Sequence, residues 1–509
     1  MTLMKRIPSI LRNAGYYPKV LLIIALFLAV PLLVLPFYPQ EAVEAAAFIL
    51  PSLLFAGAAT ALAVVAKPKS ETDAGTWQSP LHQGSLPVLF VWMAAIIGGA
   101  LPFFISGRLS FVHSLFESVS GWSTGGLSVA DIDKLPHIFL FHRAFMQFFG
   151  GLGFVIIFGI LIGGRQMMSM YNAEGHPGGM QTSLRRTSRA IILIYSSCLV
   201  IATVLYHLFG MSFFDALCHA MAAISTAGFS TRSGSIAHYN SLPIEIITIV
   251  LMLIGSTNFA VLLLVARRKF RRVARVSEVR FLGCVLLIFI PLVTFSLVAH
   301  SGLGLTDGLR NAVFAVVSTI STTGFTTSGY IAWPSFAVGL LMLLMILGGA
   351  AGSTAGGIKL VRAYILVRVT KTNLISRISP SSRVTTMRYS TPQGEEPITN
   401  ALVCDVLEFI TIYVAVIFAG TLLIAHFERA PLMDSLYEFT SVFCTIGITN
   451  GLTATASTPT LIVEMLGMVL GRLEVFIVFI GFFSALRKLR TLIKRKLRSA
   501  IEQRRLRFK

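Results

Sequence analysis

The segment Val316-Val-Ser-Thr-Ile-Ser-Thr-Thr-Gly324-Phe-Thr-Thr is one of four similar segments in this chain of 509 residues. The other three are Phe116-Glu-Ser-Val-Ser-Gly-Trp-Ser-Thr-Gly-Gly126-Leu-Ser, Ala220-Met-Ala-Ala-Ile-Ser-Thr-Ala-Gly228-Phe-Ser-Thr and Phe439-Thr-Ser-Val-Phe-Cys-Thr-Ile-Gly447-Ile-Thr. The numbered glycines recur at intervals of 102, 96 and 123 residues, and each segment lies between two apolar stretches. This self-similarity predicts four copies of one unit, in which a re-entrant segment joins two membrane spans.

The composition of these segments favours cation binding. Each begins with about ten residues of helical pattern, which is too short to cross a bilayer, and ends in Ser, Thr and Gly. Non-helical backbone at membrane depth is stable only inside protein or beside water. Four such backbones around one axis would present rings of carbonyl oxygens, which replace the water shell of an alkali cation. Glycine suits the bend because it adopts positive φ without a Cβ clash. The predicted potassium-binding filter comprises four residues of each segment: Ser123, Thr124, Gly125, Gly126, Ser225, Thr226, Ala227, Gly228, Ser321, Thr322, Thr323, Gly324, Cys444, Thr445, Ile446 and Gly447.

The composition of the whole chain is that of a membrane protein. Hydrophobic residues make up 55% and charged residues 13%, whereas soluble chains average about 25% charged residues. This excludes a single soluble enzyme or a disordered scaffold. Ten apolar runs are long enough to span a bilayer as helices: 20–37, 44–66, 85–106, 138–163, 190–210, 242–266, 281–300, 332–350, 400–427 and 460–486. The predicted fold is therefore all-α and polytopic.

The positive charge is unevenly distributed along the chain. Lys and Arg number 42 against 22 Asp and Glu, and 35 of the 42 fall on the side of both termini if the ten spans alternate. Lys and Arg gather in cytoplasmic loops, so both termini are expected in the cytoplasm. The net charge of +20 then reflects topology and attraction to anionic lipids, in preference to nucleic-acid binding.

A second set of glycines follows the four segments. Gly150, Gly255, Gly348 and Gly471 lie 24, 27, 24 and 24 residues after the filter glycines, which predicts a shared kink just below the filter. In the third copy the sequence expands to Gly348-Gly-Ala-Ala-Gly-Ser-Thr-Ala-Gly-Gly-Ile-Lys359. Five glycines without a bulky side chain before Ile358 disfavour a lipid-facing helix, so an unwound, movable loop is expected across the pathway. The predicted gating residues are Gly348, Gly349, Gly352, Ser353, Thr354, Gly356, Gly357, Lys359 and Arg472.

Arg472 is a charged residue deep in the last span, and such residues are functional hypotheses by default. It follows Gly471 and therefore shares the level of the glycine-rich loop. Two interpretations are open. Arg472 is a positive constraint on cations below the filter, or it is structural, paired with Glu474 or packed against the carbonyls of the loop.

Other polar residues have weaker signals. Asp215 and Asp434 are expected to be N-caps of short helices. Asp215 and His219, four residues apart, could form half a metal site, but a cap beside a surface histidine is the favoured interpretation. Glu117 is expected to hold its filter segment by hydrogen bonds or to attract cations at the pore mouth. Asp131 and Asp133 are expected to do only the latter.

With these motifs in view, residues 85–490 resemble the Trk/Ktr/HKT superfamily, specifically the TrkH-type membrane subunit of bacterial potassium uptake systems. The resemblance rests on Ser225-Thr-Ala-Gly-Phe-Ser-Thr231, Ser321-Thr-Thr-Gly-Phe-Thr-Thr327, Gly349-Ala-Ala-Gly-Ser-Thr-Ala-Gly-Gly-Ile-Lys359 and Gly471-Arg-Leu-Glu474. The first filter departs from the family in having Gly125 where another Thr is usual, and the fourth begins with Cys444. In the plant branch a Ser in place of the first filter glycine accompanies sodium selectivity. Gly126 is present here, which favours potassium.

The resemblance implies a single-file potassium path through four pseudo-symmetric repeats, a gating loop at 348–359 and a pore arginine at position 472. It also implies a homodimer in the bacterial inner membrane, with nucleotide-binding regulatory subunits of the TrkA type supplied by another chain. This chain has no Rossmann fingerprint of its own, so no organic cofactor is expected in it. The expected divisions are 1–84 (two extra helices), 85–189, 190–280, 281–399 and 400–509 (one repeat each, the last with a basic tail).

Two functions compete with potassium uptake, and a purely structural scaffold is a third possibility in which the repeated polar re-entrant segments would be a cost without benefit. A sodium or mixed monovalent-cation transporter would have the same fold. An intramembrane enzyme would need a nucleophile with a base, or a metal set, and no such pair recurs at useful spacing. Potassium uptake is the leading hypothesis.

Overall fold

The structure is a computed structural model that describes residues 16–65, 80–153, 184–378, 386–484, 486–487 and 490. The described chain is almost entirely helical, as the apolar composition predicts. Its one sheet, among these residues, is a hairpin of β1 (Arg388–Ser390) and β2 (Glu395–Pro397), paired antiparallel.

Six described helices are long and apolar enough to cross a membrane. They are α2 (Tyr16–Ala29, extended by a 3-10 turn to Val34), α3 (Ala45–Val65), α4 (Pro80–Ile105), α9 (Leu184–Leu208), α14 (Ser277–Ser301) and α18 (Asn400–Glu428). Two sharply bent helix pairs are together long and apolar enough for one further span each. The helix α11 (Leu242–Gly255) meets α12 (Phe259–Ala266) at 111°, and α20 (Thr458–Arg472) meets the helix Val475–Ser484 at 102°.

The two remaining expected spans are only partly seen as helix. The helix α6 (His137–Leu152) covers the first part of 138–163, and residues 154–163 lie outside the described part of the chain. The helix α16 (Ser335–Leu347) has 13 residues and stops at the glycine-rich loop. The count of ten spans and the division into repeats therefore stay predictions.

Four shorter helices precede the four filter segments. These pore helices are α5 (Phe111–Trp122), α10 (Phe213–Ile224), α15 (Leu305–Ile320) and α19 (Leu432–Phe443). Each packs on the long helix before it and on the helix after it: α5 on α4 and α6, α10 on α9 and α11, α15 on α14 and α16, and α19 on α18 and α20. Each pore helix ends at the residue before the first filter residue, so all four filters start at equivalent points.

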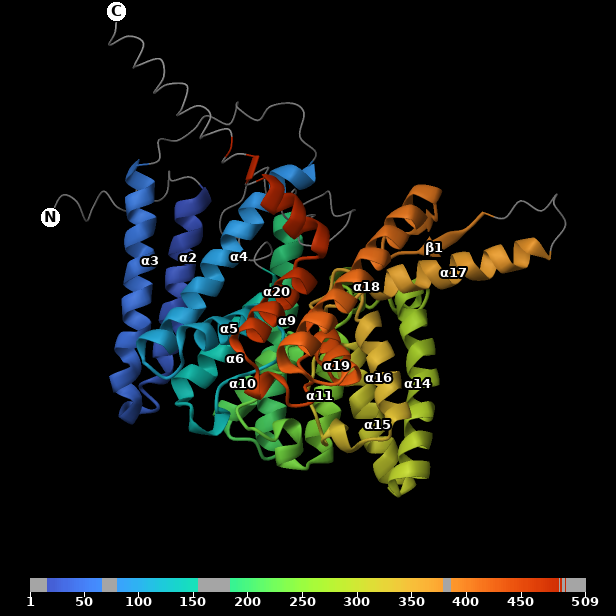
Figure 1. Ribbon diagram of the computed structural model, residues 1–509, viewed down its shortest axis with the longest axis horizontal. Coiled ribbons are helices and arrows are strands. Elements are labelled where there is room, and N and C mark those ends of the chain that lie inside the picture. The colour runs from blue at the N-terminus through green and yellow to red at the C-terminus, as the bar shows by residue number, and fades with distance from the viewer. Residues whose placement is uncertain are drawn as a thin grey trace, which may run out of the picture.

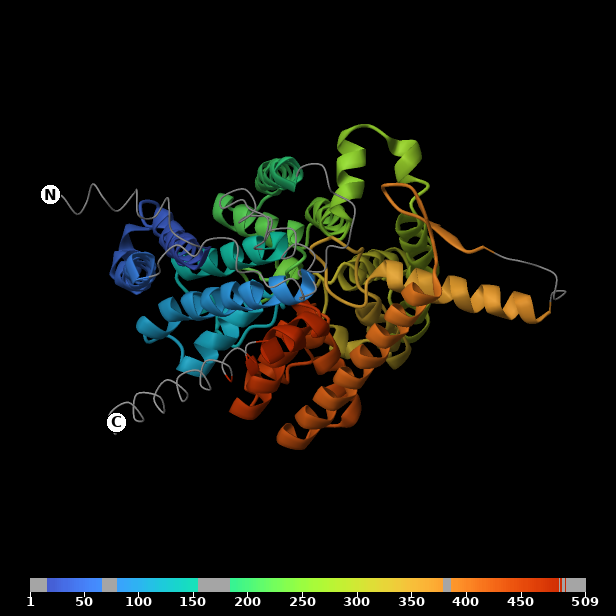
Figure 2. The same cartoon turned by 90° about the horizontal axis from the view of Figure 1, so that it is seen from above.

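The helices after the filters connect the four units into a ring. The helix α6 packs on α10, α11 on α15, α16 on α19, and α20 on α5, so the order of contacts returns to its start. Viewed from above, the units follow one another around the centre in chain order, while α2 and α3 lie outside the ring (Figure 2). These contacts form a closed ring, to which each predicted unit contributes one pore helix and one predicted filter segment.

The prediction that Asp215 and Asp434 are the N-caps of their pore helices is wrong. Ser212 is the N-cap of α10, and its hydroxyl accepts a hydrogen bond from the backbone N–H of Asp215 at 3.0 Å. Pro431 precedes α19, and Asp434 lies in its first turn instead of capping it. Both carboxylates still lie at the positive end of the helix dipole.

The segment between the third and fourth units forms a peripheral layer. Here α17 (Leu360–Arg377) runs across the direction of α14 (Figure 1), and the β1–β2 hairpin follows before α18. Earlier in the chain, between the second and third units, the short helix α13 (Phe270–Val273) follows α12 and precedes α14. The hairpin is attached to α14 by a hydrogen bond of 2.9 Å from the N–H of Ser390 to the hydroxyl of Ser277.

Candidate functional site

The four filter segments share one backbone conformation. The threonine after each pore helix has positive φ, at 58°, 52°, 55° and 53° for Thr124, Thr226, Thr322 and Thr445. The next residue does not have positive φ, and the filter glycine has it again, at 75°, 73°, 82° and 91° for Gly126, Gly228, Gly324 and Gly447. Positive φ was expected of the glycines. It was not expected of β-branched threonine, for which it is a rare and strained conformation.

The filter glycines touch their neighbours in a closed cycle. A Cβ on Gly228 would overlap the carbonyl oxygen of Thr323, and one on Gly324 would overlap that of Ile446. A Cβ on Gly447 would lie 2.7 Å from the carbonyl oxygen of Gly125, and one on Gly126 would lie 2.9 Å from that of Ala227. Every segment therefore lies against the next with no room for a side chain.

A cavity opens beside this ring. It has a volume of about 470 Å³ and is lined by all four filter glycines, together with Arg143, Phe229, Arg232 and residues of the loops that follow the filters. Asp133 accepts a hydrogen bond of 3.3 Å from the N–H of Ser233, one of the residues that line the cavity, and hydrogen bonding to Ser233 lowers the pKa of Asp133. Asp131 instead pairs with Lys134 at 2.6 Å on the exposed surface.

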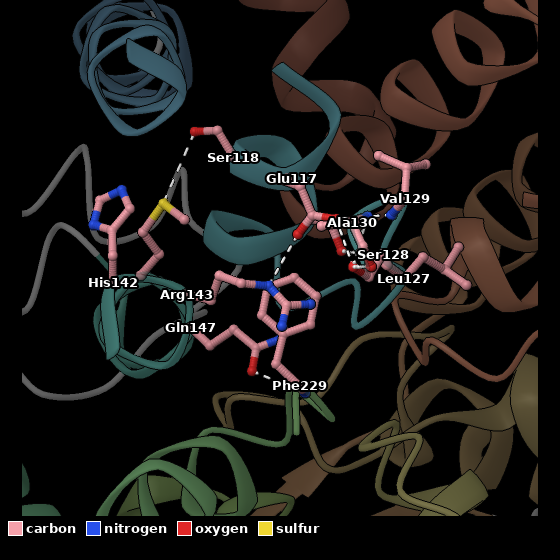
Figure 3. A network of polar contacts seen from close by, with 12 residues as sticks. Glu117, Ser118, Leu127, Ser128, Val129, Ala130, His142, Arg143, Gln147 and Phe229 are labelled. Carbon is pink, nitrogen blue, oxygen red and sulfur yellow. Dashed lines mark hydrogen bonds and ion pairs between the residues drawn. The ribbon is translucent and has the colours of Figure 1, made fainter. Parts of the chain in front are cut away.

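A buried ion pair supports the first filter from behind. Glu117, fully buried, accepts hydrogen bonds from the backbone N–H of Val129 and Ala130 at 2.7 and 3.0 Å and from the hydroxyl of Ser128 at 2.6 Å. Arg143 donates to its other carboxylate oxygen at 3.0 Å (Figure 3). The expectation that Glu117 holds its filter segment by hydrogen bonds is confirmed.

Arg143 extends this support to the second filter. Its guanidinium carbon lies 3.9 Å from the centre of the Phe229 ring (Figure 3), and Nη1 donates to the carbonyl of Ser230 at 3.5 Å. Arg143 was not among the residues singled out in the sequence, and it is 1% exposed within α6. The available signal was a basic residue inside an apolar run, which is costly in a membrane unless it is paired.

A buried glutamate also accepts hydrogen bonds from the loop that follows the fourth filter. Glu438, like Glu117 nine residues before its filter glycine, is buried and accepts hydrogen bonds from the hydroxyl of Thr449 at 2.6 Å and the N–H of Asn450 at 3.0 Å. In the second unit the corresponding residue is His219, which was expected on the surface. It is buried instead, with Nε2 2.9 Å from the hydroxyl of Ser230 and Nδ1 2.8 Å from the carbonyl of Asp215. Among the described residues no group of three metal-ligating side chains was found.

The glycine level below the filter marks the ends of helices. The helices α6, α11, α16 and α20 end at Leu152, Gly255, Leu347 and Arg472, within two residues of the four predicted glycines. A Cβ on Gly150, Gly255 or Gly471 would overlap the carbonyl oxygen of the last pore-helix residue of the same unit: Trp122, Ile224 or Phe443. Close packing thus explains three of the four glycines, while Gly348 has positive φ and lies against Gly356.

The glycine-rich loop lies directly below the filter threonines. The hydroxyl of Thr354 is 2.9 Å from that of Thr226, and the N–H of Gly356 donates to the hydroxyl of Thr322 at 2.8 Å. A Cβ on Gly356 would overlap the hydroxyl of Thr445. The loop therefore touches the filters of three units, and Thr226, Thr322, Ser353 and Thr354 are all buried.

Arg472 joins this loop to the first unit. Its Nη1 donates to the carbonyl of Thr354 at 2.6 Å, and its Nη2 donates to the carbonyls of Gly150 and Gly151 at 2.7 and 2.9 Å. The structural interpretation of Arg472 offered either a pair with Glu474 or contact with the carbonyls of the loop, and the structure shows the contact with the carbonyls. Glu474 instead pairs with Arg362 at 2.9 Å.

The end of the loop faces a second cavity of about 590 Å³. Ala351, Lys359, Arg362 and Glu474 line it, together with side chains from α18. The ammonium of Lys359 donates to the carbonyl of Ala355, which fixes the C-terminal turn of the loop. Six of the predicted gating residues are buried, and three are half-buried: Gly352, Lys359 and Arg472.

Comparison with known proteins gives consistent matches. Residues 52–488 match the family model of TrkH, described as cation transport protein. The potassium uptake protein TrkG of Escherichia coli K12 is 30% identical over 431 residues, with 79% of this chain and 85% of the relative covered. The TrkH protein of the same organism is 32% identical over 425 residues, with 79% and 85% covered. An uncharacterized cation transporter of Methanocaldococcus jannaschii is 27% identical and covers 96% of this chain.

A solved structure is similar as well. The crystal structure of the potassium transporter TrkH from Vibrio parahaemolyticus matches with a TM-score of 0.78 and 25% sequence identity. The match covers 91% of this chain and 96% of that one, so the helical fold is shared over most of the chain.

Proposed function

The chain belongs to the TrkH family of cation transport proteins, and we propose that it takes up potassium ions through the ring of its four filter segments. The family consists of transporters, so the chain is not an enzyme and the intramembrane-enzyme alternative is abandoned. The observation that carries the proposal is the closed cycle of filter glycines, each in contact with a backbone carbonyl of an adjacent segment.

The backbone of the filters suits a dehydrated cation. Alternation of positive and negative φ brings successive peptide groups to the same side of a chain. Four segments with this alternation at Thr124, Thr226, Thr322 and Thr445 would stack rings of carbonyl oxygens along the axis. A K⁺ ion exchanges its hydration shell for such rings. The pore helices end at the filters, so their negative dipole ends favour a cation there.

The glycine-rich loop and Arg472 form the proposed gate. The loop lies under the filters at Thr226 and Thr322, and Arg472 holds it by the carbonyl of Thr354. A cation leaving the filter would meet this loop and a positive charge. Glycines permit the loop to rearrange, because they allow backbone conformations closed to other residues.

Location and partners follow from charge and from the relatives. We place the chain in the bacterial cytoplasmic membrane with both termini inside, since the Lys and Arg excess lies on that side. The relatives are named as proteins of the Trk system, which implies several components. We propose a homodimer that binds a nucleotide-binding regulatory subunit of the TrkA type on the cytoplasmic side.

The proposal is tested by bacterial growth at low potassium and by ion uptake into proteoliposomes. Expression in a bacterium that lacks potassium uptake should restore growth at low potassium, and proteoliposomes should accumulate K⁺ or Rb⁺ in preference to Na⁺. Normal membrane insertion without growth or flux would overturn the proposal. Equal uptake of Na⁺ and K⁺ would favour the alternative of a sodium or mixed-cation transporter.

A further inference from the structure

Gln147 contacts the backbone of the second filter at both ends of its amide. Its Nε2 donates to the carbonyl oxygen of Ala227 at 2.5 Å, and its Oε1 accepts from the N–H of Phe229 at 3.1 Å. The side chain is fully buried on α6 and points toward Phe229 (Figure 3). Because one end accepts and the other donates, only one orientation of the amide satisfies both contacts.

The three other units lack this amide. Gln147 lies three residues before Gly150, and the same position before Gly255, Gly348 and Gly471 is occupied by Met252, Met345 and Met468. The sulfur of Met468 lies against Gly125 of the first filter, as Gln147 lies against the second. In these two units the helix after one filter therefore lies against the next filter around the ring, and the first unit does so with a hydrogen-bond donor.

This contact makes one layer of the filter asymmetric. The carbonyl of Ala227 is also the oxygen nearest to the position of a Cβ on Gly126, at 2.9 Å, so it belongs to the ring. The equivalent carbonyls are those of Gly125, Thr323 and Ile446. Within the described part of the chain, no hydrogen bond to these three carbonyls is found, whereas that of Ala227 has the donor of Gln147.

We propose that Gln147 is a positioning residue for ion selectivity, acting through the carbonyl of Ala227. A carbonyl held by a donor from behind cannot turn inward to follow a smaller ion, and the donor also weakens its field toward the axis. Both effects disfavour Na⁺ relative to K⁺, because the smaller ion needs a tighter ring or stronger ligands. This inference rests on the proposed potassium transport.

The experiment measures the K⁺/Na⁺ permeability ratio from reversal potentials of the full chain in planar bilayers or proteoliposomes. Q147M gives the first unit the residue found in the three other units, and we expect the ratio to fall about fivefold, the effect of losing one hydrogen bond of ordinary strength. M345L, at the equivalent position of the third unit, is the matched control and should keep the wild-type ratio. If Q147M does not insert, Q147L makes the same test.

The variant Q147E tests whether the hydrogen bond of residue 147 to the carbonyl of Ala227 sets the K⁺/Na⁺ ratio, or only the volume of its side chain. A protonated glutamic acid can donate to the carbonyl of Ala227 and accept from Phe229, whereas the ionised form has no donor. The K⁺/Na⁺ ratio of Q147E should therefore be high at acidic pH and fall as pH rises, while the ratio of the wild type follows pH less steeply. Q147M with an unchanged ratio, or with reduced flux alone, would overturn the inference. A wild type that carries no K⁺ would instead overturn the proposed function.

Discussion

Arg472 donates a hydrogen bond of 2.6 Å to the carbonyl oxygen of Thr354, at the centre of the glycine-rich loop. The same guanidinium donates to Gly150 and Gly151, so one side chain from the fourth unit joins the loop of the third to a helix of the first. Hydrogen bonds from a charged donor contribute about 1.5–3 kcal/mol each. The three hydrogen bonds of Arg472 therefore hold the loop against the ring that the four units form.

Removal of this side chain should release the loop. We expect R472A to raise basal potassium flux about tenfold in proteoliposomes without a regulatory subunit, because the closed loop loses charge-assisted hydrogen bonds. R472K keeps the charge but not the planar fork, and should give an intermediate flux. Flux of R472A at or below that of the wild type, at equal protein in the membrane, would show that Arg472 does not hold a gate.

The loop can be fastened to the filter by a disulfide. The hydroxyls of Thr226 and Thr354 are 2.9 Å apart, so T226C/T354C places two sulfurs within bonding reach. Oxidation should abolish flux, and a reductant should restore it. The single variants T226C and T354C are the controls. Full flux of the oxidised double variant, with the cross-link verified by mass spectrometry, would mean that the loop need not move.

Substitution of a filter glycine should abolish transport. In G324V the new side chain would overlap the carbonyl oxygen of Ile446, and the residue would keep a φ of 82°. G107V is the matched control, since Gly107 has a φ of 69° but no atom within 4 Å of its Cβ position. The control should carry only the backbone strain of about 1–2 kcal/mol and retain transport. Ion flux and folded yield of both variants decide the point.

We expect the stability of the fold to depend on keeping both Glu117 and Arg143, or on removing both charges together. R143M leaves the carboxylate of Glu117 buried without its cation, at a cost of about 3–5 kcal/mol. The double variant E117Q/R143M removes the charge and should recover most of the lost stability. Thermal unfolding in detergent measures both effects. Equal stability of R143M and the wild type would contradict this role, as would a double variant less stable than R143M.

The local sequence determined a large part of this protein. The apolar runs and the four Ser/Thr–Gly segments were sufficient to predict an all-α membrane fold and positive φ at the filter glycines. They also predicted a break in the helices near Gly255 and Gly471. These features depend on hydrophobicity, on the missing Cβ of glycine and on repetition along the chain. Each of these can be read without knowing which residues meet in space.

Only the tertiary structure decided the partners of the polar residues. Arg143 forms a buried pair with Glu117, and Glu474 pairs with Arg362 instead of Arg472. Gln147 and the hydroxyl of Thr354 contact filters of other units, 80 and 128 residues away in the chain. A buried donor needs an acceptor, but its sequence does not say which element supplies it. The closing of four units around one axis determines which residues meet.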